Sequence, residues 1–139
     1  GIPKPAFNAF TLLHRLGEQR LANDSPEVLV TRHSDGTLVL ALWNYAEVGE
    51  RAPVRSVALR FTHTNARMAS VQSIDGEHGN VQVAYERMGS PRYPTQRELA
   101  QLRQAAAIPA AIQPPLQSGE LALEIPSDGL VLVTIPPGS

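Results

Sequence analysis

The spacing of apolar residues predicts a chain that opens with one helix and is otherwise built mainly from strands. Behind Pro5, which a first helical turn tolerates, apolar residues recur at intervals of three and four as far as Leu16. Gly17 is expected to end this helix in a left-handed conformation. Phe7 and Leu12 widen its apolar face, so we expect the helix to be buried on two sides.

Strand-forming residues dominate most of the remaining chain. A hairpin is predicted over 28–45, because the Asp35-Gly36 pair between its two apolar halves is a tight-turn signal. Residues 54–62 alternate between apolar and polar, as a sheet with one wet face requires, and residues 68–74 predict a weaker strand. A second hairpin is predicted over 121–135, around another Ser-Asp-Gly turn.

Two short helices are expected inside this β-rich region. Residues 81–88 place apolar side chains at helical spacing before a glycine. Thr95 and Glu98 predict a capping box, which starts a helix that continues to about residue 107. Residues 109–119 contain three prolines and no apolar periodicity, so they are interpreted as an extended surface loop.

These elements together predict a mainly β fold, an antiparallel β-sandwich with a leading α-helix and one or two short helical insertions. A small Greek-key barrel is the rival architecture. A chain of 139 residues is long enough to bury a core as one domain.

Composition narrows the classes of partner. The net charge of −1 removes the usual electrostatic case for nucleic acid, and no apolar run approaches the ~20 residues that span a bilayer. We therefore expect neither nucleic acid nor membrane as a partner. The absence of cysteine excludes disulfides and thiol catalysis. It suits oxidising and reducing compartments alike. An export signal could lie upstream, so the location of the protein stays open.

Residues 73–95 resemble the C-terminal part of family-39 glycoside hydrolases, the β-xylosidases and their α-L-iduronidase relatives. In that family an Asp-x-x-His-x-Asn turn is followed by an aromatic residue and then by Met-Gly-Ser-Pro-x-x-Pro-Thr. The matching positions here are Asp75, His78, Asn80, Tyr85, Met88, Gly89, Ser90, Pro91, Pro94 and Thr95. Tyr85 stands where the family pattern leads us to expect Trp.

A second segment, residues 1–21, resembles the last helix of the catalytic barrel in the same family. There a Pro-Lys-Pro entry leads into an Ala-Phe-x-x-Leu helix, and the same residue types occur here in the same order. The resemblance implies two parts, a terminal barrel helix over 1–21 and an accessory β-sandwich over 22–139. It also implies that the chain begins inside a larger enzyme, whose catalytic barrel is its natural partner.

The resemblance further implies where catalysis takes place. Retaining glycosidases use two carboxylates about 5 Å apart. In the family resembled both are Glu at barrel strand ends, one of them after Asn, and this chain contains no Asn-Glu dipeptide. It also lacks the Gly-x-Ser-x-Gly elbow of a serine hydrolase. We therefore expect no catalytic residues in this chain. Its expected function is to brace a β-xylosidase-type catalytic barrel.

The turn over residues 75–80 is the strongest candidate for a site. Asp75, Glu77 and His78 are the one tight cluster of metal-ligand types, but a lasting site needs three or four convergent ligands, so neither a metal nor a cofactor is predicted. The polar side chains are expected instead to bond nearby backbone amides. A further interpretation has Asp75, His78, Asn80 and Tyr85 at the domain interface or the substrate entrance.

Exposed aromatic residues define the first rival function. Trp43 and Tyr93 are candidates for stacking on sugar rings, which would make the chain a carbohydrate-binding module for xylan-type sugars. Trp43 lies in the most apolar predicted strand, however, and burial in the core is the favoured interpretation.

The second rival function is dimerisation through the leading helix. Phe7, Phe10 and Leu13 would then form the contact between two copies of the chain.

Overall fold

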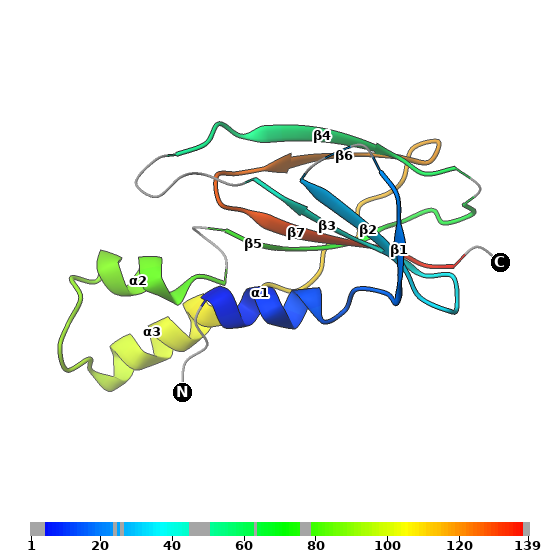
Figure 1. Ribbon diagram of the computed structural model, residues 1–139. Helices are drawn as coiled ribbons and strands as arrows, with labels where there is room; N and C mark the ends of the chain where they lie inside the picture. Colours follow the sequence, from blue (N-terminus) through cyan, green and yellow to red (C-terminus); the bar gives the residue numbers. More distant parts are fainter. Residues whose placement is uncertain are drawn as a thin grey trace.

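A computed structural model describes residues 5–23, 25, 27–44, 51–62, 64–75 and 79–137, with side chains from residue 8 onward. Figure 1 shows a short leading helix, a sandwich of strands and a pair of helices that projects from one end. The elements in chain order are α1 (Pro5–Leu13), β1 (Gln19–Leu21), β2 (Val28–Arg32), β3 (Leu38–Trp43), β4 (Arg55–Arg60), β5 (Ser70–Ile74), α2 (Val81–Arg87), α3 (Gln96–Ala106), β6 (Glu120–Ile125) and β7 (Leu130–Ile135).

The strands form two antiparallel sheets. One sheet has five strands in the order β1-β2-β3-β7-β5, and the other pairs β4 with β6. The sheets face each other, and α1 lies on the opposite side of the larger sheet (Figure 1). The predicted antiparallel β-sandwich is therefore confirmed, with two separate sheets in place of a closed barrel.

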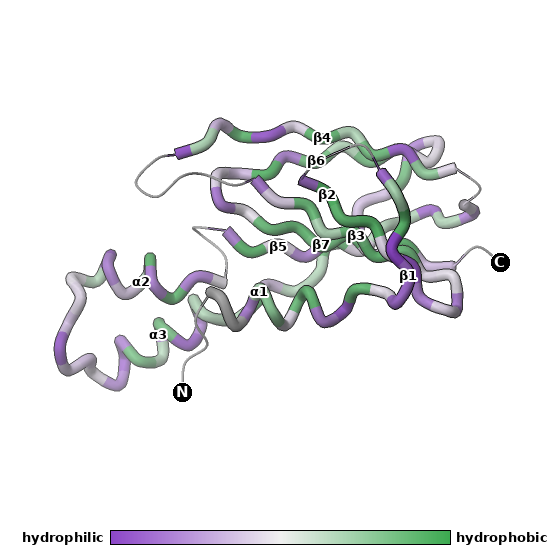
Figure 2. Tube along the Cα trace, in the orientation of Figure 1, coloured by the Kyte–Doolittle hydropathy of each residue, from purple (hydrophilic) through white to green (hydrophobic). Residues whose placement is uncertain are grey.

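The main core lies between the two sheets. Leu40 and Leu42 of β3 and Val131 and Val133 of β7 face β4 and β6 and are almost completely buried. Figure 2 shows the apolar colour concentrated in these central strands, whereas β4 alternates. Near-continuous apolar sequence in β3 and β7 is expected where both faces of a strand are covered.

The second core lies between α1 and the outer face of the larger sheet. Leu12 is 1% exposed and packs with Val39, Ala41 and Leu132, which alternate with the residues of the main core. The helix is therefore an integral layer of this fold, and full burial of a leucine side chain contributes roughly 2–3 kcal/mol.

The predicted hairpin over 121–135 is wrong. β6 pairs with β4, whereas β7 pairs with β3 and β5, so the turn between them crosses from one sheet to the other. Asn44 holds this crossing, because its Nδ2 donates to the Ile125 carbonyl at 2.9 Å and its own carbonyl accepts from the Asp128 amide at 2.7 Å. An Asp-Gly turn signal does not distinguish a hairpin from such an arch.

The leading helix is shorter than expected, and it does not end at a left-handed glycine. α1 ends at Leu13, and β1, which also lies within residues 1–21, pairs with β2. Gly17 has no positive φ. It is needed instead for close approach, since a Cβ there would lie 2.4 Å from the Arg32 carbonyl oxygen.

The two helical insertions are confirmed, and the following loop is more ordered than expected. Thr95 and Glu98 form the complete capping box of α3, and Gly89 after α2 has a φ of 91°. Within the segment predicted as a surface loop, Ile112 exchanges two backbone hydrogen bonds with Val71 at 2.8 and 2.9 Å. This segment therefore lies along the outer edge of β5.

Candidate functional site

A buried amide joins α1 to the two insertion helices. Asn8 lies one helical turn before Leu12 and is 3% exposed. Its Nδ2 donates to the carbonyl of Gly79, before α2, at 2.8 Å, and to the carbonyl of Ala106, at the end of α3, at 2.5 Å. This role of Asn8 was not predicted, although a lone Asn within an apolar helix face is a signal for a buried, hydrogen-bonded amide.

Gly79 and Asn80, at the end of the predicted site turn, lie at this junction. Asp75 follows β5 and is half-buried, whereas His78 lies outside the described residues. Asn80 is the N-cap of α2, and its Oδ1 accepts from the amides of Gln82 at 3.1 Å and Val83 at 3.3 Å. Asn80 therefore has the structural role that was one interpretation of this turn. That the turn borders an interface or a substrate entrance stays a prediction.

Tyr85 fixes the loop between α2 and α3. Its hydroxyl donates to the carbonyl of Pro91 at 2.7 Å, and its carbonyl accepts from the Ser90 amide at 3.0 Å. The ring is half-buried. Where a Trp was expected from the family pattern, the phenol provides a donor that closes this loop.

The two candidate stacking residues do not share a surface. Tyr93 is 84% exposed in the loop between α2 and α3, with the Arg92 guanidinium 5.7 Å from its ring centre. Trp43 ends β3, within the sandwich, whereas that loop lies at the outer end of the helix pair (Figure 1). These two side chains therefore do not form a joint platform for a sugar chain.

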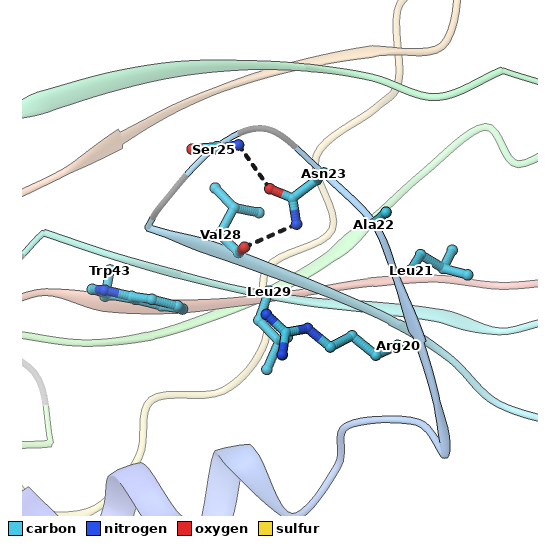
Figure 3. Close-up of a pocket in the computed structure, with 8 residues that line it drawn as sticks. All are labelled: Arg20, Leu21, Ala22, Asn23, Ser25, Val28, Leu29 and Trp43. Atoms are coloured by element: carbon cyan, nitrogen blue, oxygen red, sulfur yellow. Dashed lines mark hydrogen bonds between the residues drawn. The ribbon is translucent and has the colours of Figure 1, made fainter.

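Trp43 borders an open groove on the outer face of β1 to β3. The groove has a volume of about 790 Å³ and is lined by Arg20, Leu21, Ala22, Asn23, Ser25, Val28, Leu29 and Trp43. In Figure 3 the Arg20 side chain extends from β1 past Leu29, and the Asn23 side chain is tied to the backbone of Ser25 and Val28. Trp43 and Leu29 are only partly buried against the second core.

The side of α1 that faces away from the sheet carries exposed apolar surface. Phe10 is 65% exposed, whereas Leu13 is half-buried against the second core. The side chain of Phe7, the third residue of the predicted contact, lies outside the described side chains. The helix therefore buries one side on its own sheet and leaves Phe10 uncovered.

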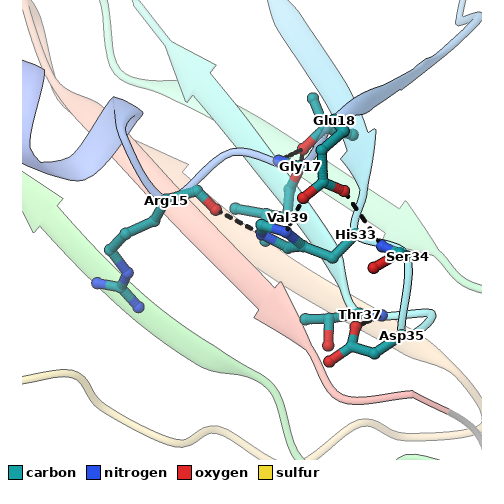
Figure 4. A network of polar contacts seen from close by, with 9 residues as sticks. Arg15, Gly17, Glu18, His33, Ser34, Asp35, Thr37 and Val39 are labelled. Atoms are coloured by element: carbon teal, nitrogen blue, oxygen red, sulfur yellow. Dashed lines mark hydrogen bonds and ion pairs between the residues drawn. The ribbon is translucent and has the colours of Figure 1, made fainter.

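A polar network fastens the segment after α1 to the β2–β3 turn (Figure 4). His33 Nε2 lies 2.9 Å from the carbonyl oxygen of Arg15, and its Nδ1 lies 3.4 Å from Glu18 Oε1. Both neighbours are acceptors, so both ring nitrogens donate only when the imidazole is protonated. The Ser34 amide also donates to Glu18, at 3.2 Å.

This network shifts the pKa of both partners. The hydrogen bond to the Arg15 carbonyl and the neighbouring Glu18 carboxylate raise the pKa of His33 above 6.5. Hydrogen bonds from its own backbone amide and from His33 lower the pKa of Glu18. The ion pair is thus present between the lowered pKa of Glu18 and the raised pKa of His33.

Metal-ligand groups and membrane-spanning helices were both sought among the described residues. Over the described ranges, no group of three or more His, Asp or Glu side chains is placed to hold a metal ion. Among the described helices, none is long and apolar enough to cross a membrane.

The model of the family "Glycosyl hydrolases family 39" matches residues 1–121 of this chain. The match covers most of the 139 residues, and the chain belongs to this family. The resemblance found in the sequence motifs is thereby confirmed.

Known relatives agree with this assignment. A β-xylosidase of Geobacillus stearothermophilus is 33% identical over 105 residues, which are 75% of this chain and 21% of that protein. A monomeric β-xylosidase from Caulobacter crescentus CB15 has the same fold over 100% of this chain and 32% of its own, with a TM-score of 0.84 at 17% identity. The family-39 enzyme from Xanthomonas axonopodis pv. citri gives 0.76 at 20% identity, over 99% of this chain and 31% of its own. The chain therefore spans between a fifth and a third of these relatives.

Replacing Asn8 is expected to destabilise the helix junction. Asn8→Ala leaves the buried carbonyls of Gly79 and Ala106 without their donor and should lower the free energy of unfolding by about 2–4 kcal/mol. Asn8→Asp keeps the shape but cannot donate, so it should cost at least as much. Urea unfolding measures both, with exposed Gln101→Ala as a control expected within about 0.5 kcal/mol. Equal stability of Asn8→Ala and the control would contradict this role.

The His33–Glu18 pair is expected to make stability depend on pH. Because folding raises the pKa of His33, its contribution is fully present below 6.5 and is lost as the pH rises through the folded value. Glu18 behaves oppositely, since its lowered pKa adds stability that is lost only as the pH falls through the folded value.

Urea midpoints measured from pH 6 to 9 test this. His33→Gln should remove the decline seen above pH 6.5, whereas His14→Gln, at an exposed histidine after α1, should keep it. An identical decline in both variants would exclude the pair as its cause.

Proposed function

We propose that this chain is the non-catalytic C-terminal β-sandwich portion of a β-xylosidase-type enzyme and that it braces the catalytic barrel. The barrel, outside this chain, would hydrolyse the O-glycosidic bond. The observation that carries the proposal is that α1 is buried on one side and carries an exposed aromatic residue on another. Leu12 is sealed on the sheet, whereas Phe10 on another side of the same helix is 65% exposed.

A second apolar surface lies on the larger sheet. The groove with Trp43 and Leu29 leaves part of the outer sheet face uncovered. Apolar surface in this arrangement is typical of a contact with another domain. A catalytic barrel that packs on α1 and this sheet face would bury it. If residues 1–21 include the last barrel helix, as the family resemblance implies, the chain passes into the sandwich between Leu13 and Gln19.

Three acidic residues of the described chain make structural contacts. Glu27 is ion-paired with Arg55, and Glu120 Oε1 lies 2.6 Å from Arg60 Nη2. Glu98 completes the capping box of α3. Carboxylates engaged in this way are not poised across a cleft as a glycosidase requires, which supports a non-catalytic role.

The chain alone is expected to show no hydrolysis of an aryl β-xyloside. The expectation follows because the two catalytic carboxylates would lie on the absent barrel. The assay uses purified chain with the full-length parent enzyme as the positive control. Heat-labile turnover that follows the chain through every purification step would overturn the non-catalytic role.

The bracing role predicts different effects of Phe10→Asp in two contexts. In the isolated chain the substitution lies on the surface and should change the unfolding free energy by less than about 0.5 kcal/mol. In the full-length parent it would place a charge in a domain contact and should cost about 2 kcal/mol or more. Thermal unfolding of both proteins makes the comparison.

Ala122→Asp is the matched control, because Ala122 is exposed on the outer side of β6. It should have little effect in either protein. Equal effects of Phe10→Asp in the chain and in the parent would refute bracing through α1. A monomer–dimer equilibrium of the chain that Phe10→Asp abolishes would favour dimerisation instead.

Sugar binding is the second candidate, because the groove combines the Trp43 ring with the side chain of Arg20. Calorimetric titration with xylohexaose tests it. Saturable heat that is lost in both Trp43→Ala and Arg20→Ala, with the fold retained, would favour a xylan-binding module over a brace.

A further inference from the structure

The loop between α2 and α3, with the helix ends that flank it, concentrates positive charge. Residues 87–97 contain Arg87, Arg92 and Arg97 and no acidic residue, although the whole chain has a net charge of −1. All three arginines are exposed. The loop lies at the end of the helix pair that is farthest from the sandwich (Figure 1). Positive charge that gathers at one projecting end attracts anionic partners.

An exposed aromatic residue occupies the same loop. The Tyr93 ring is 84% exposed, and the guanidinium of Arg92 lies 5.7 Å from the ring centre. These two residues occupy the positions that the family pattern Met-Gly-Ser-Pro-x-x-Pro-Thr leaves open. Their chemistry is therefore specific to this chain, and a ring so exposed contributes little to packing within the described residues.

The loop holds this pair on a rigid base. The Tyr85 hydroxyl donates to the Pro91 carbonyl at 2.7 Å, and the Tyr85 carbonyl accepts from the Ser90 amide at 3.0 Å. Pro91 and Pro94 flank the pair, and proline restricts the backbone on both sides. Side chains on a rigid loop lose less conformational entropy when they bind a ligand.

The two glutamates nearest to the loop in sequence have partners within their own helices. Glu98 Oε1 accepts from the Thr95 amide at 2.9 Å in the capping box of α3. Glu86 Oε1 accepts a side-chain hydrogen bond within α2 at 3.3 Å. Among the described residues, neither Arg92 nor Arg97 forms an ion pair. Their guanidinium groups can therefore bind an external carboxylate.

We propose that Arg92, Tyr93 and Arg97 bind a sugar chain that carries uronic acid groups. The Tyr93 ring would stack on a sugar ring, because the faces of sugar rings are apolar. The guanidinium groups would bind the carboxylate of the uronic acid through charge-assisted hydrogen bonds. The proposal rests on the proposed function for one point, that the sugar chain is of the xylan type.

Other partners fit these residues less well. Nucleic acid needs many phosphate contacts, and a chain with a net charge of −1 provides only a weak field for them. An acidic peptide would pair with the arginines, but acidic side chains give the Tyr93 ring no apolar face to stack on. A neutral xylan chain would stack on Tyr93 but leave the arginines unused. A sugar chain with carboxylates uses both kinds of group.

Calorimetric titration of the isolated chain at low salt tests the proposal with two tetrasaccharides. One is xylotetraose, and the other is a xylotriose that carries one glucuronic acid. The acidic sugar should bind at least about tenfold more tightly, a difference that one charge-assisted hydrogen bond provides. Added salt should weaken its binding. Equal affinity for the two sugars, or no binding of the acidic one, would overturn the proposal.

Variants of the chain locate the binding. Arg92→Gln and Tyr93→Ala should each weaken binding of the acidic sugar by about threefold or more, with the fold retained. The matched controls are Arg67→Gln, at an exposed arginine of the sandwich, and Trp43→Ala, in the groove of the larger sheet, and both should keep the binding. Losses in either control that equal those in the loop variants would contradict the proposal.

A blocked tripeptide with one glutamate separates sugar recognition from general attraction of charge, because it carries the same single charge as the acidic sugar. It should bind more weakly than the sugar. Binding as tight as that of the sugar would exclude a specific sugar site. The titrations use the isolated chain, so a failure of bracing through Phe10 leaves their outcome unchanged.

Discussion

The structure depends on the burial of both faces of its central strands. β3 and β7 are apolar at nearly every position, so one face needs β4 and β6 and the other needs a helix. Leu12 provides that second cover, and the buried amide of Asn8 places α1 relative to α2 and α3. A segment that resembles a barrel helix is thus also a structural layer of the sandwich.

Leu12 of α1 is buried on the larger sheet, whereas Phe10 on another side of the same helix is 65% exposed. Phe10 and the groove beside Trp43 leave apolar surface of the described chain exposed. If the chain braces a catalytic barrel, as proposed, contact with that barrel would cover both.

Much of the fold followed from local pattern, and the errors occurred where distant contacts decide. The capping box at Thr95 and the glycine after α2 are local signals, and both were predicted correctly. The path of the chain after Ile125 was predicted wrongly, because Asn44, which is distant in sequence, holds the turn there. Asn8 was missed for the same reason, since its acceptors lie 71 and 98 residues away. The structural role of Asn80 was foreseeable because N-caps act locally.

Hydroxyl-radical footprinting of Phe10 tests the central claim most directly, because the rate of ring oxidation follows exposure to solvent. The isolated chain and the full-length parent enzyme are compared, with the 84% exposed Tyr93 as the internal reference. The account predicts that Phe10 is oxidised readily in the chain and is protected severalfold in the parent. Equal oxidation of Phe10 in both proteins would contradict the account, because Phe10 would then be as exposed in the parent enzyme as in the isolated chain.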